Sequence, residues 1–131
     1  MGDPGVLVVF RERRGGRRAI AAALAREGPL TVLAIAPRRE LRGNCIIYTG
    51  ALDDAIDEAA ERDLRDAREI LGDRAERATF VLLATRSNGD VAEWALRAGV
   101  RRAIVAPRRL RRTDPVARAL ARAGIEVSVA L

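Results

Sequence analysis

The chain has 131 residues, of which 49% are hydrophobic, and a formal net charge of +6 at pH 7. This length favours one domain, residues 1–131, and the apolar content argues against disorder. All 24 basic residues are arginines and there is no histidine, which excludes a P-loop lysine, a Schiff base and a histidine general base. No apolar run is long enough to span a bilayer, so no membrane association is expected. The single cysteine, Cys45, and a start without a signal-like core predict a cytoplasmic protein.

Strands and helices alternate in the first third of the chain. Residues 6–10 are all apolar and predict a strand buried on both faces. A helix is expected over 17–27, where the Gly28-Pro29 pair stops it. Residues 30–36 then predict a second strand, which ends at Pro37.

A long helix is predicted over 51–71. Its buried stripe is expected at Leu52, Ile56, Ala60, Leu64, Ala67 and Leu71. Residues 51–76 contain ten acids and four arginines, a net charge of −6, while the rest of the chain carries +12. This division predicts an acidic and a basic face, which suits the steering of anions or self-association.

The second half of the chain repeats the alternation. Residues 79–85 predict a strand, and Asp90 is expected to cap the helix that follows and ends at Gly99. A fourth strand is expected over 103–106.

The last two elements carry clear signals. Asp114 followed by Pro115 is typical of a helix start, and Gly124 of a helix end. Residues 125–131 alternate between apolar and other side chains, as in a final strand. The whole pattern predicts an α/β protein, a doubly wound five-stranded parallel sheet with helices on both faces.

Thirteen arginines follow the ends of predicted strands. In open parallel sheets ligands bind at the carboxyl ends of the strands, so this edge is expected to favour an anion. Arginine forks bind phosphate in a bidentate manner, and a helix N-terminus opened by two glycines attracts anions. The candidate anion- or nucleotide-binding residues are Arg11, Arg13, Arg14, Gly15, Gly16, Arg38, Arg108, Arg109, Arg111 and Arg112. The alternative is that these arginines solvate loops and pair with the acidic helix of a neighbouring molecule.

Several functional motifs are absent from the sequence. There is no G-x-G-x-x-G after the first strand, no G-x-x-x-x-G-K-[ST], and no metal ligands with useful spacing. We therefore predict no metal site and assign no catalytic residue.

Two stretches resemble the universal stress protein family. They are GDVAEWALRAGVRRAIVAP (residues 89–107), in which a helix ends in glycine and leads into an apolar strand, and the terminal IEVSVAL (residues 125–131). The order and lengths of the predicted elements match that family over essentially the whole chain. The resemblance implies strand order 3-2-1-4-5 and a non-enzymatic, stress-related regulatory or binding module.

The chain departs from the ATP-binding members of this family at two places. Arg11 stands where they have an aspartate, and PRRLRRTDP (residues 107–115) replaces their glycine-rich phosphate loop. Proline lacks an N–H and side chains obstruct a close backbone approach, so the family's phosphate cradle is not expected here. No cofactor is assigned; ATP or another adenine nucleotide stays open, although its motif is absent.

The resemblance also implies a partner, since the family's last strand pairs with its own copy. We predict a homodimer through Val127, Val129 and Leu131. Two rival functions stay open: a weak nucleotide hydrolase using Glu12 or Glu40 as the base, and a nucleic-acid accessory protein. Only four aromatic residues are available for stacking, which disfavours nucleic acid as a partner.

Overall fold

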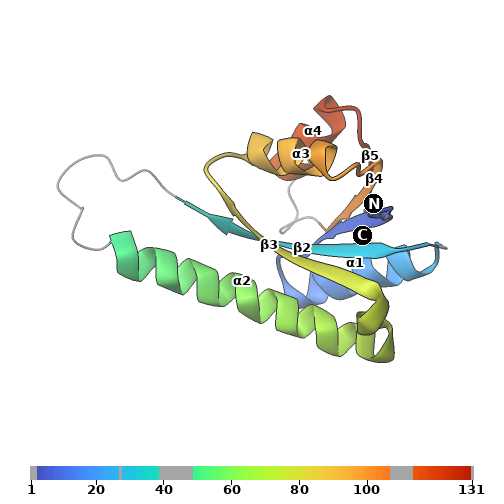
Figure 1. Ribbon diagram of the computed structural model, residues 1–131, viewed down its shortest axis with the longest axis horizontal. Helices are drawn as coiled ribbons and strands as arrows, with labels where there is room; N and C mark the ends of the chain where they lie inside the picture. Colours follow the sequence, from blue (N-terminus) through green and yellow to red (C-terminus); the bar gives the residue numbers. More distant parts are fainter. Residues whose placement is uncertain (1–2, 27, 39–48, 107–113, 131) are drawn as a thin grey trace.

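The computed structural model describes residues 3–26, 28–38, 49–106 and 114–130, with side chains from residue 52 in the long helix. Five parallel strands form one sheet in the order β3-β2-β1-β4-β5, which confirms the predicted fold class and strand order (Figure 1). The strands are β1 (Val6–Val9), β2 (Leu30–Pro37), β3 (Ala78–Thr85), β4 (Arg102–Val105) and β5 (Glu126–Val129). The helices are α1 (Arg13–Leu24), α2 (Thr49–Leu71), α3 (Asn88–Arg97), α4 (Pro115–Arg122) and the 3-10 helix η2 (Gly72–Arg77).

The helices cover the sheet from both sides (Figure 1). Helices α1 and α2 pack on one face, in a core that includes Val8 and Val32. Helices α3 and α4 pack on the other face, against Leu7, Val9 and Leu33. Successive strand residues point to opposite faces, so the apolar run of β1 supplies both cores.

Helix α1 begins four residues earlier than the sequence predicts and ends at Leu24 rather than at residue 27. The Gly15-Gly16 pair therefore lies inside the helix. A Cβ atom on Gly16 would lie 2.2 Å from the ring of Phe10, which is fully buried. Gly16 is thus needed for the packing of α1 on β1, and its low helix propensity is overridden.

The start of α3 also differs from the prediction. Ser87, not Asp90, is the N-cap residue, and Asp90 occupies the third helical position. The Asp90 carboxylate accepts the backbone N–H groups of Arg86 at 2.7 Å and Ser87 at 3.2 Å. These bonds lower the pKa of Asp90 below its ordinary value, with the bond from Arg86 contributing most. The predicted cap of α4 is confirmed: Asp114 accepts from the backbone N–H groups of Val116 and Ala117.

The buried stripe of α2 is shorter than predicted. Ala60, Leu64, Ala67 and Leu71 are buried and pack against the sheet, whereas Leu52 is 40% exposed. The first turns of α2 extend past the body of the sheet, so the described strands do not cover Leu52 (Figure 1). Among the described residues, no helix is both long and apolar enough to cross a membrane.

Candidate anion site at the carboxyl edge of the sheet

The carboxyl edge of the sheet is stepped. Val9 of β1 lies beside Leu33 of β2, but β2 and β3 remain paired as far as Pro37 and Thr85. The four further residues of β2 extend the sheet by about 13 Å along the strand direction. The arginines that follow β1 and those that follow β2 therefore lie at different heights along the strand direction.

Arg38 follows the longer strand β2 and is bound to the acidic helix α2. Its Nη2 donates to Asp57 Oδ1 of α2 at 2.7 Å. This hydrogen bond is the main cause that raises the pKa of Arg38 above its ordinary value. The Nη1 atom of Arg38 is buried and has no acceptor among the described residues.

Arg13, in the first turn of α1, is held by the same helix. Its Nη1 donates to Asp66 Oδ1 at 2.8 Å and to Glu69 Oε2 at 3.2 Å. The pKa of Arg13 is raised, chiefly by the bond to Glu69 and then by the charge of Asp66. Asp57 and Asp66 are nine residues apart on α2, about 13 Å along its axis. Arg13 and Arg38 are thus bound at separate places on α2 and do not form one cluster.

Arg11 links three elements where β1 and β4 end. Its Nη2 donates to the backbone oxygen of Ala106 at 2.8 Å and forms an ion pair with Asp114, the cap of α4. The two side chains are only 10% and 7% exposed. The Nε atom of Arg11 is buried and finds no acceptor in the described part of the chain. A donor of this kind is a candidate contact for an anion.

The carboxylate of Asp114 stays ionised in this setting. Burial raises its pKa, but the hydrogen bond and charge of Arg11 and the two α4 amides outweigh this effect, so the net pKa is lowered. The same carboxylate therefore serves as a helix cap and as the partner of a buried guanidinium.

The first turn of α1 completes the site. A Cβ atom on Gly15 would lie 3.0 Å from the Cβ of Ala106, so the helix start lies close to the end of β4. No side chain caps this helix start, and Arg14 beside it is exposed and has no ion pair within the described residues. We call Arg11, Arg14, Gly15, Ala106 and Asp114 the switch-point cluster, because strand order reverses between β1 and β4.

The predicted site residues have different positions. Arg11, Arg14 and Gly15 belong to the switch-point cluster, Gly16 is a packing residue, and Arg13 and Arg38 are bound to α2. Arg108, Arg109, Arg111, Arg112 and also Leu131 lie outside the described residues. Asp114 is recognisable from the sequence as a helix cap, whereas its pairing with Arg11, which joins residues 103 positions apart, has no local sequence signal.

Arg11 is also a position at which the chain departs from the ATP-binding members of the family it resembles. The side chain of Arg11 lies where the ATP-binding members have an aspartate, and it is tied down by Ala106 and Asp114. No group of three or more Cys, Asp or Glu residues in the described ranges could hold a metal ion.

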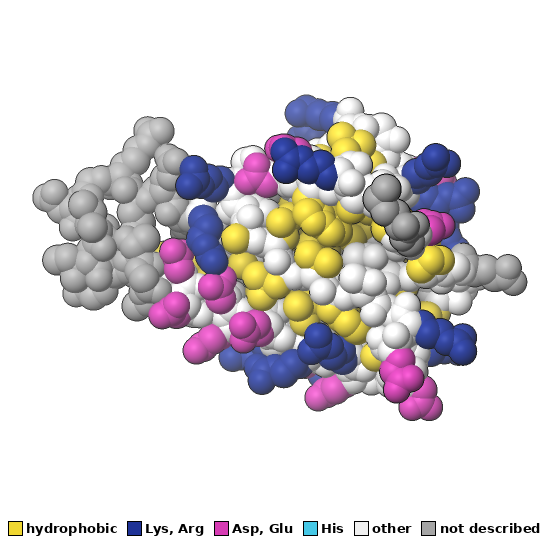
Figure 2. Space-filling model, viewed as in Figure 1, with side chains coloured by type: hydrophobic (Ala, Val, Ile, Leu, Met, Phe, Trp, Pro, Cys, Tyr) yellow, Lys and Arg dark blue, Asp and Glu magenta, His cyan; other side chains and the backbone are white. Residues whose placement is uncertain are grey.

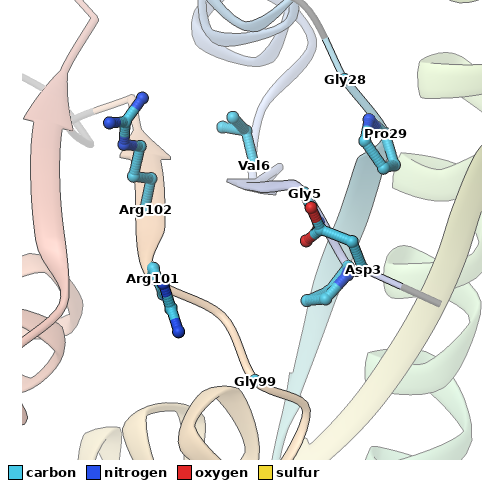
Figure 3. A pocket seen from close by; sticks show the side chains of 9 residues that line it. Asp3, Gly5, Val6, Gly28, Pro29, Gly99, Arg101 and Arg102 are labelled. Carbon is cyan, nitrogen blue, oxygen red and sulfur yellow. The ribbon is translucent and has the colours of Figure 1, made fainter. Parts of the chain in front are cut away.

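A hollow of about 580 Å³ lies at the opposite, amino edge of the sheet (Figure 3). It is lined by Asp3, Pro4, Gly5, Val6, Gly28, Pro29, Gly99, Arg101 and Arg102. Arg102 forms an ion pair with Glu126 of β5 at 3.4 Å. The side chains of Arg101 and Arg102 point in different directions in Figure 3, so they do not form a common anion clamp.

Comparison with known proteins supports the fold. No family model and no curated protein matches the chain. Among solved structures, it is similar to a protein of the universal stress protein family from Burkholderia pseudomallei, with a TM-score of 0.71, 19% identity and 98% of both chains covered. It is also similar to a universal stress protein from Archaeoglobus fulgidus, with a TM-score of 0.59, 20% identity, and 95% and 90% of the two chains covered. The fold predicted from the sequence resemblance is confirmed over nearly the whole chain.

Proposed function

Because the chain has the universal stress protein fold, we propose that it is a divergent, non-enzymatic binding module of that kind. It recognises a small anion at the switch-point cluster, and its ATP site is degenerate. The observation that carries this proposal is the buried Nε donor of Arg11, which has no acceptor among the described residues. The uncapped amides of the α1 first turn and the exposed guanidinium of Arg14 support it.

The neighbouring ion pairs favour a small ligand. Arg13 and Arg38 are already paired with carboxylates of α2, which leaves Arg14 as the arginine of the switch-point cluster without an ion pair among the described residues. A single phosphate or carboxylate group matches that charge distribution better than a triphosphate does.

Isothermal titration calorimetry with inorganic phosphate, AMP, ATP and a cyclic dinucleotide tests the proposal. Binding heat is expected with the wild-type protein and at least a tenfold weaker affinity with Arg14→Ala. Arg101→Ala is the matched control, since it removes the same charge at the opposite edge of the sheet. Absence of heat with every ligand at millimolar concentration excludes the small-anion site.

Non-enzymatic binding is proposed because a proton acceptor is scarce at this site. Asp114 is engaged as a cap and ion-pair partner, and Glu12, a candidate base, is the N-cap residue of α1, next to the cluster in sequence. Phosphate release from ATP above the rate of the Glu12→Gln variant would favour the weak hydrolase instead. A salt-dependent gel shift would favour the nucleic-acid accessory protein.

We further propose a homodimer through the C-terminal strand. The N–H groups of Glu126 and Ala130 bond to Arg101 and Val105 of the neighbouring segment, so alternation turns the N–H groups of Val127 and Val129 outward. These outward groups support pairing with a second copy. The cytoplasmic location stays a prediction.

A further inference from the structure

Strand β3 is the longer of the two edge strands, and its own residues carry none of the usual protection against pairing. Its eight residues, ATFVLLAT, include no charge, proline or glycine, whereas β5 has four residues and carries Glu126. Natural edge strands are usually short, charged or covered. From Phe80 to Leu83 the side chains of β3 are only partly buried, and Ala84 is exposed. Figure 2 shows hydrophobic side chains on both sides of β3, between α2 and α3.

One backbone hydrogen bond establishes which groups of β3 face outward. The N–H of Arg38, which follows β2, donates to the oxygen of Thr85 at 2.6 Å, so the backbone groups of Thr85 face β2. Strand residues alternate between the two sides, so the N–H and C=O groups of Phe80, Leu82 and Ala84 face away from the sheet. Ala78 shares this side, but its N–H is already bonded to the oxygen of Ala75.

The outward groups are symmetric about Leu82. In an antiparallel pair of identical strands, two-fold symmetry requires one residue to lie opposite its own copy. With Leu82 at that position, Phe80 of each copy lies opposite Ala84 of the other, and all three outward residues exchange hydrogen bonds. A register centred on Val81 would instead place Ala84 opposite Ala78, whose N–H is already used.

The charges on α2 agree with the same symmetry. The guanidinium carbon of Arg68 lies 4.7 Å from the centre of the Phe80 ring, which marks the side of α2 that borders β3. Helical spacing extends this side to five exposed residues. They are Asp54, Glu58, Glu61, Arg65 and Arg68. The first half of this row is acidic and the second half is basic, as Figure 2 shows along α2.

We infer that the exposed edge of β3 is a self-association surface for a second copy of this chain. The two β3 strands pair antiparallel about Leu82, which joins two five-stranded sheets into one. The two-fold axis brings the acidic half of each α2 toward the basic half of the other. If all five residues of this row carried charges of the same sign, the two α2 helices would repel each other and oppose the pairing.

Sedimentation velocity of the full chain over a concentration series tests the inference. Ala84→Pro removes an outward N–H that has no acceptor among the described residues, and it is expected to weaken association by at least tenfold. Val129→Pro is the matched comparison for the other edge, because it makes the same change at the outward N–H of β5, where the C-terminal dimer is proposed. Circular dichroism establishes that each variant is folded. Should Ala84→Pro fail to fold, Ala84→Lys blocks the edge with a charge and leaves the backbone unchanged.

The outcomes separate the two edges. If only Ala84→Pro reduces association, β3 is the interface and the proposed β5 dimer is wrong. If only Val129→Pro does so, the inference for β3 is wrong. If both variants reduce association, both edges pair. The inference is overturned if the wild-type protein is monomeric at every concentration of a 100-fold dilution series. Amide hydrogen exchange gives a direct reading, since exchange at Phe80, Leu82 and Ala84 should slow as concentration rises.

Discussion

The pairing of Arg11 with Asp114 is the main electrostatic feature of the described chain, because both side chains are buried. Removing one member of a buried pair leaves the other charge without a partner. We expect Arg11→Met to lower the free energy of unfolding by about 3 kcal/mol. Arg11→Met combined with Asp114→Asn, which keeps a good N-cap residue, should recover much of this loss. Urea unfolding of the two single variants and the double variant measures the coupling, and strictly additive losses would contradict it.

The same pair predicts how stability changes with pH. The pKa of Asp114 is lowered from its ordinary value of 3.8 in the folded protein. Its contribution to stability is therefore complete above that ordinary value and is lost as the pH falls through the lowered folded pKa. The stability difference between wild type and Asp114→Asn should be constant near neutrality and shrink toward pH 3. Urea unfolding at a series of pH values measures it; a difference that grows on acidification would be inconsistent with a lowered pKa.

Gly16 is a second position where one residue decides the packing. A Cβ atom there would collide with the Phe10 ring at 2.2 Å, so Gly16→Ala should destabilise the protein by about 1–3 kcal/mol. Gly89, in the first turn of α3, is the control. A Cβ at Gly89 meets only Ser87 Oγ at 3.6 Å, and Gly89→Ala should be neutral or slightly stabilising. Thermal unfolding of both variants gives the comparison, and equal melting temperatures would refute the packing role of Gly16.

At the scale of elements, α2 has a buried half and a projecting start. Leu64 is 8% exposed and packs against the sheet, so Leu64→Ala should cost about 2–5 kcal/mol. Leu52→Ala, at the projecting start, should change stability by less than about 0.5 kcal/mol. Chemical denaturation distinguishes the two. A large loss at Leu52 would mean that a partner or another segment covers it.

The elements themselves could be predicted because their periodicity is local. The apolar run of β1, the cap at Asp114 and the spacing of Leu64 and Leu71 are each visible within a few residues of sequence. The start of α1 could not be predicted, since the need for Gly16 arises only when Phe10 packs beneath it. The exposure of Leu52 likewise depends on where the sheet ends.

The candidate site was less predictable than the fold. The sequence shows that the arginines follow strands. Their ion-pair partners, however, are acidic residues far away along the chain. Hydrophobic periodicity carries no information on which carboxylate a guanidinium will meet. Arg13 and Arg38 meet carboxylates of α2 in their own chain.

At the scale of the whole molecule, both cores share one sheet. Val8 packs with α1 and α2, while its neighbours Leu7 and Val9 pack with α3 and α4. Loss of either core exposes the strands of the other, so we expect a single cooperative unfolding transition. Differential scanning calorimetry should give equal calorimetric and van't Hoff enthalpies. Two resolved transitions would show that residues 1–131 are not one folding unit.

The assignment of helices to faces also has a consequence for biosynthesis. The helices of one face lie within residues 13–71 and those of the other face come later, within residues 88–122. While the ribosome translates from α3 to the end of α4, Leu7, Val9 and Leu33 have no cover. At typical elongation rates this interval lasts on the order of seconds. The nascent polypeptide therefore passes through a stage in which one hydrophobic face of the incomplete sheet is accessible to chaperones and can aggregate.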